Sequence, residues 1–253
     1  MTPRRLYILT GASRGLGAAM AEQLLAPDVH LLTMARHPDP SLPDRALTAG
    51  TTLEQWAIDL GDDASAAARL ETWLQPHAAA TFSAATLINN AGLLGRVGPI
   101  DRSDADQLAA VLRVGLEAPL LLSAAFLRAT RDWAIDKRVL NISSGAGRRP
   151  IAGWAAYCAA KAGLDHYSRV VALDEALLPH PARVVALAPG VIDTNMQGEL
   201  RAADAAGFPE QFQFVDLKAT GQLPTPKAAA SRVLAYLART DFGTQPVADV
   251  RDA

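Results

Sequence analysis

The chain has little cysteine, no long uninterrupted apolar run and almost no net charge. Its single cysteine, Cys158, excludes an internal disulfide bond, so we expect the reducing cytoplasm as its compartment. No uninterrupted apolar run approaches the roughly eighteen residues of a membrane-spanning helix, so no membrane partner is expected. The N-terminal apolar run, Leu6 to Leu9, is too short for the core of a signal peptide.

Charge and length further limit the possible partners and the number of domains. Twenty-four basic residues against twenty-six acidic ones give a net charge of −2, and no basic block provides a nucleic-acid footprint. We therefore expect no nucleic-acid partner. No metal site is predicted either. A chain of 253 residues, half of them hydrophobic, suits one α/β domain over residues 1–253.

Short apolar runs alternate with longer helical patterns along the chain. Strands are expected at 6–10, 29–35, 56–58, 87–88, 139–142, 184–188 and 246–250, and helices at 18–25, 62–75, 104–131, 153–178 and 225–239. Asp62 should cap the second helix, residues 37–44 should form a surface loop, and Pro119 should kink or break the third helix. This order predicts a single Rossmann-type, doubly wound parallel β-sheet with helices on both faces.

The first predicted strand runs directly into a glycine-rich turn, T-G-A-S-R-G-L-G, at residues 10–17. Glycines in such a turn allow close backbone approach to a ligand, and the following helix N-terminus offers free N–H groups to a phosphate. A dinucleotide cofactor is therefore expected here, on Gly11, Ser13, Arg14, Gly15, Leu16 and Gly17.

The second predicted strand ends at Arg36, where an enzyme that prefers NAD would place an acidic residue against the adenosine ribose. Arg36 and Arg14 together suit a 2′-phosphate, which favours NADPH over NADH. The alternative is that Arg36 only solvates the end of a loop.

Two further strand ends should border the same crevice, because ligands bind at the carboxyl ends of parallel strands. Asp59 and Leu60 follow one strand and are placed to meet the adenine. Another strand ends in N-N-A-G, residues 89–92, which adds Asn90, Ala91 and Gly92 to the cofactor site.

The stretch from Asn141 to Lys161 carries the candidate chemistry. Tyr157 and Lys161 are four residues apart and share one helix face, while Ser144 follows a strand end. An ammonium about 5 Å from a phenol, at an effective dielectric of about 20, should lower the phenol pKa by about 2 units. Tyr157 would then exchange protons near neutral pH. The alternative is a surface tyrosine beside a solvated lysine.

Taken together, these motifs resemble the short-chain dehydrogenase/reductase family over essentially the whole chain. They are Thr10-Gly11-x-x-x-Gly15-x-Gly17, Asn89-Asn90-Ala91-Gly92, Ser144, Tyr157-x-x-x-Lys161 and Pro189-Gly190 through Thr194. The resemblance implies hydride transfer with Tyr157 as general acid and Ser144 on the substrate oxygen. It also implies that Lys161 binds the nicotinamide ribose, that Ile192 and Thr194 hold the carboxamide, and that Gly190 lies beside the substrate.

Within the family, the second half is similar to sepiapterin reductases and bacterial benzil reductases. The shared residues are Gly153-Trp154 before Tyr157-Cys158, Asp193-Thr194-x-Met196-Gln197 and Val247-x-Asp249. The resemblance implies a vicinal dicarbonyl substrate, either a pterin or a diketone, and nominates Asp249 as a substrate anchor. The alternative for Asp249 is a solvated carboxylate near the chain end. One departure is Gly115, which stands where the family usually has a proton-relaying asparagine.

Some questions stay open at this level. The protein could be a non-catalytic NADPH-binding or sensing protein that retains the fold, and the missing asparagine supports that alternative. A serine hydrolase built on Ser144 is a remote third, because the G-x-S-x-G elbow is absent. Residues 195–224 could be a mobile substrate lid or a packed excursion. The alanine-rich helix at residues 155–176 suits the face of a homodimer or homotetramer, and packing in the core would give the same pattern.

Overall fold

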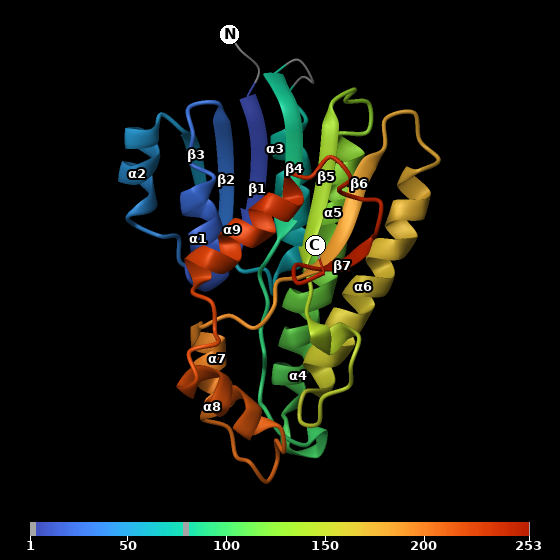
Figure 1. The fold of residues 1–253 in the computed structure, drawn as a ribbon. Helices are drawn as coiled ribbons and strands as arrows, with labels where there is room; N and C mark the ends of the chain where they lie inside the picture. Colours follow the sequence, from blue (N-terminus) through green and yellow to red (C-terminus); the bar gives the residue numbers. More distant parts are fainter. Residues whose placement is uncertain (1–3, 78–80, 253) are drawn as a thin grey trace.

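The computed structural model describes residues 4–77 and 81–252, which form one twisted parallel sheet between two layers of helices (Figure 1). The strand order is β3-β2-β1-β4-β5-β6-β7. The strands are β1 (Arg4–Thr10), β2 (Val29–Ala35), β3 (Thr52–Ala57), β4 (Phe82–Asn89), β5 (Asp136–Ile142), β6 (Ala182–Ala188) and β7 (Val247–Asp249). The predicted Rossmann-type fold is confirmed.

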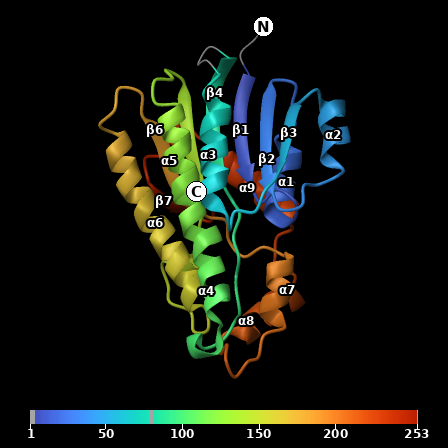
Figure 2. The same ribbon diagram turned by 180° about the vertical axis from the view of Figure 1, so that it is seen from behind.

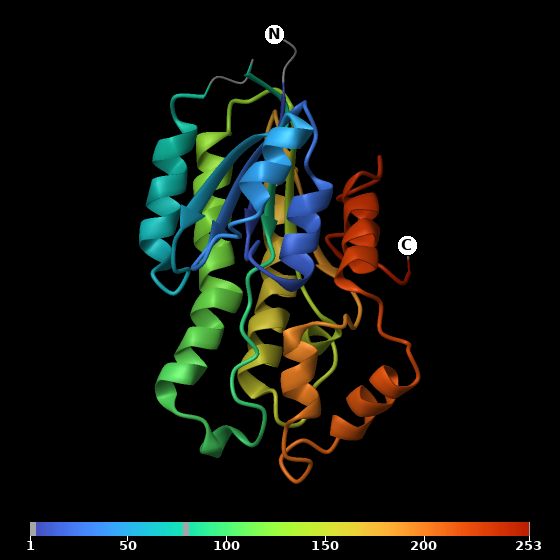
Figure 3. The same ribbon diagram turned by 90° about the vertical axis from the view of Figure 1, so that its left-hand side faces the viewer.

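Helices cover both faces of the sheet (Figure 3). On one face pack α1 (Gly15–Gln23) and α9 (Pro226–Leu237), and on the other α3 (Asp63–Leu74), α5 (Ala118–Ala129) and α6 (Ala155–Glu175). Because both faces are covered, the central strands are mostly apolar, and every residue of β2 is buried. This is why apolar runs, and not alternation, located the strands in the sequence.

Several element boundaries differ from the expected ones. Residues 37–44 do not stay a loop throughout, because α2 (Leu42–Ala49) begins inside them with Pro43 in its first turn, where proline costs no hydrogen bond. Strand β3 also starts earlier than expected, at Thr52. Asp62 occupies the N-cap position of α3, but its side chain accepts no capping hydrogen bond, so the predicted cap is wrong.

The long central helix is interrupted as Pro119 predicted, but the irregularity lies just before the proline. A regular α4 (Ala105–Leu112) passes through a π-helical stretch (Arg113–Glu117) into α5. Proline has no N–H to offer the carbonyl four residues earlier, and the wider turn absorbs that loss within one continuous helix.

The stretch from Ala105 to Ala129 is long and apolar enough to cross a membrane by length and composition, since eighteen consecutive residues within it have a mean hydropathy of 1.7. A search for uninterrupted apolar runs in the sequence does not find it. Its Ala118, Leu122 and Phe126 are buried in the main core against the sheet, which is the environment of a core helix.

Two short helices, α7 (Asn195–Arg201) and α8 (Gln211–Ala219), lie beyond the carboxyl ends of the strands (Figures 1 and 2). They belong to the predicted 195–224 segment. A third apolar cluster holds them to the loop after β5, separate from the two clusters on the faces of the sheet. The segment therefore forms one wall of whatever binds at this end of the sheet.

Candidate active site

A cleft of about 1500 Å³ opens at the carboxyl ends of the strands. All of the residues that the sequence nominated for cofactor, catalysis or substrate line it, from Gly11 in the first turn to Asp249 in β7. The parallel sheet brings most of them together, because they lie at or just after the ends of strands, and the start of α6 adds Tyr157 and Lys161.

The glycine turn is closely fitted to its surroundings. Gly11 and Gly15 have φ of 70° and 57°, a conformation that side chains disfavour. A Cβ on Gly17 would lie 2.1 Å from the carbonyl oxygen of Gly11. The loop thus brings main chain, and not side chains, to the floor of the cleft.

Hydrogen bonds tie this turn to the end of β4. The Thr10 hydroxyl accepts from the backbone N–H groups of Asn90 at 2.9 Å and Ala91 at 3.0 Å. In return, the Asn90 amide donates to the carbonyl oxygens of Thr10 at 3.0 Å and Gly11 at 3.2 Å. The N-N-A-G motif therefore holds the two central strand ends in fixed positions.

The residues at this end fit a dinucleotide. Helix α1 has no side-chain cap and no acidic residue in its first turn, so its N-terminal N–H groups and partial positive charge are available to a phosphate. A Cβ on Gly15 would lie 3.4 Å from Thr194 Cγ2, which makes Thr194 the opposite wall of a narrow passage. Arg14 and Arg36 are exposed where they border the cleft.

The candidate catalytic residues meet on the other side of the cleft. Ser144 lies just after the end of β5, and Tyr157 and Lys161 lie one turn apart on α6. The Lys161 ammonium donates to the Ile142 carbonyl oxygen at 2.7 Å and lies 5.7 Å from the centroid of the Tyr157 ring. All three side chains line the same cleft.

The predicted pKa of Tyr157 is wrong in direction. Burial raises the pKa of Tyr157 above its ordinary value, and the hydrogen bond with Ser144 only partly opposes this. Burial also lowers the pKa of Lys161 to about 8, against the opposing charge of Asp165. The sequence argument counted the attraction between ammonium and phenolate but not the cost of removing each charge from water.

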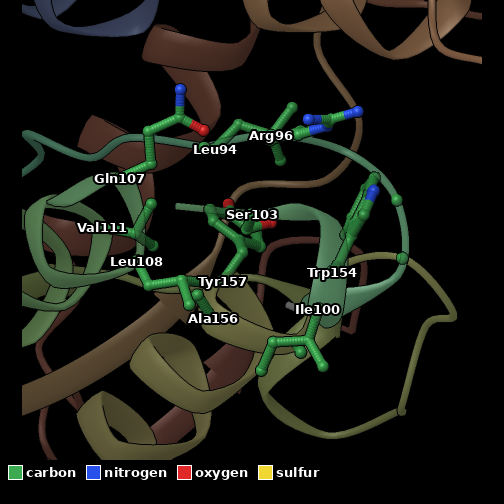
Figure 4. A pocket seen from close by; sticks show the side chains of 14 residues that line it. Leu94, Arg96, Ile100, Ser103, Gln107, Leu108, Val111, Trp154, Ala156 and Tyr157 are labelled. Atoms are coloured by element: carbon green, nitrogen blue, oxygen red, sulfur yellow. The ribbon is translucent and has the colours of Figure 1, made fainter. Parts of the chain in front are cut away.

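A small side pocket of about 10 Å³ adjoins Tyr157 (Figure 4). Leu108, Val111, Ile100 and Trp154 give it apolar walls, and Ser103 and Gln107 add polar groups. This volume corresponds to about one water molecule. The pocket shares Leu94, Arg96 and Gln107 with the main cleft, so it is a narrow branch beside the tyrosine.

The wall made by α7 and α8 is held by aromatic packing. Trp154 stacks on Phe208 at 5.4 Å between ring centroids and contacts Tyr157 edge-on at 5.6 Å. Phe208 is fully buried, and Phe214 lies 5.5 Å from it. In this structure residues 195–224 are thus packed against the rest of the protein, and their motion as a lid stays a prediction.

The matching family model is that of the short chain dehydrogenases, and it covers residues 5–205. The chain belongs to the short-chain dehydrogenase/reductase family. It is therefore an oxidoreductase that acts on CH–OH or C=O groups with a nicotinamide cofactor.

Relatives of this short-chain dehydrogenase/reductase include the benzil reductase ((S)-benzoin forming) of Bacillus cereus, 34% identical over 94% of this chain and 96% of that protein. The sepiapterin reductase of Rattus norvegicus is 32% identical over 97% of this chain and 95% of its own length. A solved structure, a putative 2-deoxy-D-gluconate 3-dehydrogenase from Agrobacterium tumefaciens with bound NADP, has a TM-score of 0.78 and 25% identity over 98% and 95% of the two chains.

In this short-chain dehydrogenase/reductase a side chain at position 115 would press on α6, and Ala160 would have to move by a few tenths of an ångström to admit it. Gly115 is buried in the π-helical stretch, and a Cβ there would lie 3.2 Å from the Ala160 Cβ. Position 160 directly precedes Lys161 on α6. Gly115, which stands where the family usually has asparagine, therefore lies at the contact between the π-helical stretch and α6.

Sequence reasoning missed an ionic cluster behind the catalytic residues. Asp165 is 2% exposed, accepts from the Ser143 hydroxyl and pairs with Arg148 Nε at 3.1 Å. The spacing of Asp165, four residues after Lys161, was a signal that could have found it. Gly147 was missed too, since a Cβ there would lie 2.7 Å from the Lys161 carbonyl oxygen.

Asp249 belongs to the same cluster. It lines the cleft, yet its carboxylate is paired with Arg251, whose hydrogen bonds hold the pKa of that carboxyl below its usual range. The alternative of a solvated carboxylate is wrong, because Asp249 is 5% exposed. Its role as a substrate anchor stays a prediction.

Proposed function

We propose that the protein is an NADPH-dependent carbonyl reductase that transfers hydride to a ketone, with a vicinal dicarbonyl as substrate and Tyr157 as general acid. The observation that carries this proposal is that Ser144, Tyr157 and Lys161 line the same cleft as the glycine turn. Similarity to benzil and sepiapterin reductases supports the substrate class.

The cofactor would be held along the whole cleft. The glycine turn and α1 would bind the pyrophosphate, Asp59 and Leu60 the adenine, and Asn90 to Gly92 the central part. Lys161 would bind the nicotinamide ribose, while Ile192 and Thr194 would hold the carboxamide. Bound NADPH supplies the hydride to the carbonyl carbon.

The side chains at the substrate end then supply position and a proton. Ser144 holds the carbonyl oxygen by a hydrogen bond, and Tyr157 donates its proton to that oxygen as negative charge develops. The raised pKa of Tyr157 keeps the phenol protonated at neutral pH, which suits reduction. Lys161, with a pKa of about 8, remains mostly cationic at pH 7 and stabilises the tyrosinate left behind.

The preference for NADPH is supported by the two exposed guanidinium groups at the adenosine end, Arg14 and Arg36. A 2′-phosphate is a dianion that a guanidinium binds through paired hydrogen bonds. An enzyme for NADH gains nothing from two cations at this point.

A non-catalytic NADPH-binding or sensing protein is the second candidate. It is favoured by Gly115, since glycine has no side chain to order a proton-relaying water behind Lys161. The retained Ser144, Tyr157 and Lys161 weigh against it.

The deciding experiment follows NADPH absorbance with a panel of diketones and pterins. The wild type should oxidise NADPH with at least one of them, and Tyr157→Phe should lower the rate roughly 10³-fold while NADPH still binds. Tyr167→Phe is the matched control, because Tyr167 is a partly buried tyrosine on the same helix, with a buried hydroxyl, outside the cleft lining. Near-full activity of Tyr157→Phe would refute the role of this residue, and no turnover across the panel would favour the sensor.

We also propose a homo-oligomer in the cytoplasm. Val170 and Leu173 on α6 and the nearby Leu177 are 44%, 71% and 85% exposed, an apolar surface that a second copy of the chain would cover. Light scattering of the purified protein should give a mass of two or four chains, and a monomer would contradict this assembly.

A further inference from the structure

We infer that Arg251 binds the Asp249 carboxylate in place of a substrate and so determines substrate specificity. It would select against dicarbonyl substrates with a hydrogen-bond-donating edge, such as pterins, and favour diketones that lack such an edge. The inference deepens the proposed function and rests on it. It makes Arg251 a specificity-determining residue at the substrate end of the cleft.

Arg251 uses most of the hydrogen-bonding capacity of the Asp249 carboxylate. Its Oδ1 accepts from the Arg251 backbone N–H at 2.9 Å and from Nε at 2.8 Å, and its Oδ2 accepts from Nη2 at 2.6 Å. A carboxylate offers about four acceptor positions, so three are in use. Because Asp249 is 5% exposed, its surroundings leave little access to the remaining one.

The charges around Asp249 also cancel. Arg148 Nη1 lies 3.9 Å from Asp249 Oδ2, while its Nε pairs with Asp165 at 3.1 Å. Two guanidinium groups thus face two carboxylates, and the cluster has no spare negative charge for a substrate. Removing Arg251 would leave one excess negative charge beside the cleft, held in place by Arg148.

Arg251 competes from a favourable position. It is two residues from Asp249 in the chain, so its local concentration is far above that of any free substrate. Its side chain is nevertheless 65% exposed, so packing does not lock it in place. An aminopyrimidine edge could bind Asp249 only by displacing this bidentate partner, whereas a diketone without donor groups needs no such displacement.

The test compares sepiapterin with benzil at saturating NADPH for wild type, Arg251→Ala and Arg251→Lys. The ratio of kcat/KM for sepiapterin to that for benzil should rise about tenfold or more in Arg251→Ala, the gain expected when a charge-assisted competitor is lost. Arg251→Lys keeps the cation but loses the bidentate geometry, so its ratio should fall between those of wild type and Arg251→Ala. Adding Asp249→Asn to Arg251→Ala should remove the gain.

Arg239→Ala is the matched control, since Arg239 makes the same bidentate pair with an aspartate two residues away, Asp241, outside the cleft lining. It should leave the ratio unchanged. An unchanged ratio in Arg251→Ala, or a gain that survives Asp249→Asn, would overturn the inference.

Calorimetric titration of sepiapterin into the NADP-loaded proteins separates this inference from the proposed function. If no variant reduces any carbonyl, the proposed reductase function is wrong. Tighter sepiapterin binding by Arg251→Ala than by wild type would still show that Arg251 blocks access to Asp249. Equal binding by the two proteins would reject it.

Discussion

The two ends of the cleft are built in different ways. At the cofactor end, the main chain does the work: glycines with positive φ, the N-terminus of α1 and the Thr10 to Asn90 hydrogen bonds shape the site. At the substrate end, side chains from distant segments meet, as Trp154 does with Phe208 and Arg148 with Asp249. A site made of backbone needs particular residues at fixed spacing, whereas a site made of packed side chains does not.

The comparison predicts its largest effect at Gly17. In Gly17→Ala the new methyl group would collide with the Gly11 carbonyl oxygen at 2.1 Å, and main chain cannot easily move away. NADPH binding, measured by fluorescence titration, should be lost. Gly198→Ala is the control, because a Cβ there meets no atom within 4 Å and alanine favours a helix. Wild-type NADPH affinity in Gly17→Ala would show that the turn is more adaptable than its geometry indicates.

The substrate end should respond to loss of packing instead. Phe208→Ala removes a fully buried ring from the cluster with Trp154 and should cost about 3–5 kcal/mol of local stability. We expect a lower Tm and a raised KM for the carbonyl substrate, with NADPH affinity little changed. Phe212→Ala, also on this segment but 65% exposed, should be near wild type. Equal weakening of substrate and cofactor by Phe208→Ala would mean that the two ends are not independent.

Lys161 connects the two ends, and its burial should be measurable as stability. Its pKa falls from 10.5 to about 8, which at about 1.4 kcal/mol per unit of pKa costs the folded state roughly 3 kcal/mol at pH 7. The unfolded chain holds more protons between pH 8 and 10.5, so this group adds stability as pH rises through that window.

Lys161→Met should therefore abolish turnover yet raise the free energy of unfolding at pH 7 by roughly 2 kcal/mol, after loss of the hydrogen bond to Ile142. Denaturant unfolding at pH 7, 9 and 10.5 should show this advantage shrinking as pH rises. The exposed Lys227→Met should show no such trend. An advantage that grows with pH would contradict the assigned pKa.

The smallest effect is expected for Arg36. Arg36→Ala should weaken NADPH binding roughly tenfold and leave NADH binding within about twofold, because only the former carries a 2′-phosphate. Arg45→Ala removes an exposed arginine that pairs with Glu22 at 3.1 Å and should alter neither. If Arg36→Ala weakens the two cofactors equally, the side chain only shapes the loop.

Much of the fold could be predicted from local pattern. Buried parallel strands such as β2 are mostly apolar, and the glycine turn directly follows another of them, β1. Helix α2 was missed because Pro38, Pro40 and Pro43 together indicate a loop in the sequence, although the first turn of a helix, where Pro43 lies, accepts proline. The π-helical stretch was located only through Pro119, because no residue pattern specifies that widening by itself.

In the site, too, some features could be predicted from the sequence and others could not. Tyr157 and Lys161 were found from their spacing, but the direction of the tyrosine pKa was missed, because spacing gives the distance between two charges and not their separation from water. Asp249 was found from the resemblance, but its pairing with Arg251 was missed, because that pairing is seen only once β7 is placed at the edge of the cleft.

The sequence by itself determined the family, the parallel sheet and the line of residues along the cleft, because short-range steric and hydrogen-bonding requirements select those residues at those positions. Tertiary structure alone decided which charges are buried, which partners they have and how tightly Gly115 and Phe208 are packed. Burial and pairing are properties of surfaces that meet only after folding, and the free energy of each charge depends on those surfaces.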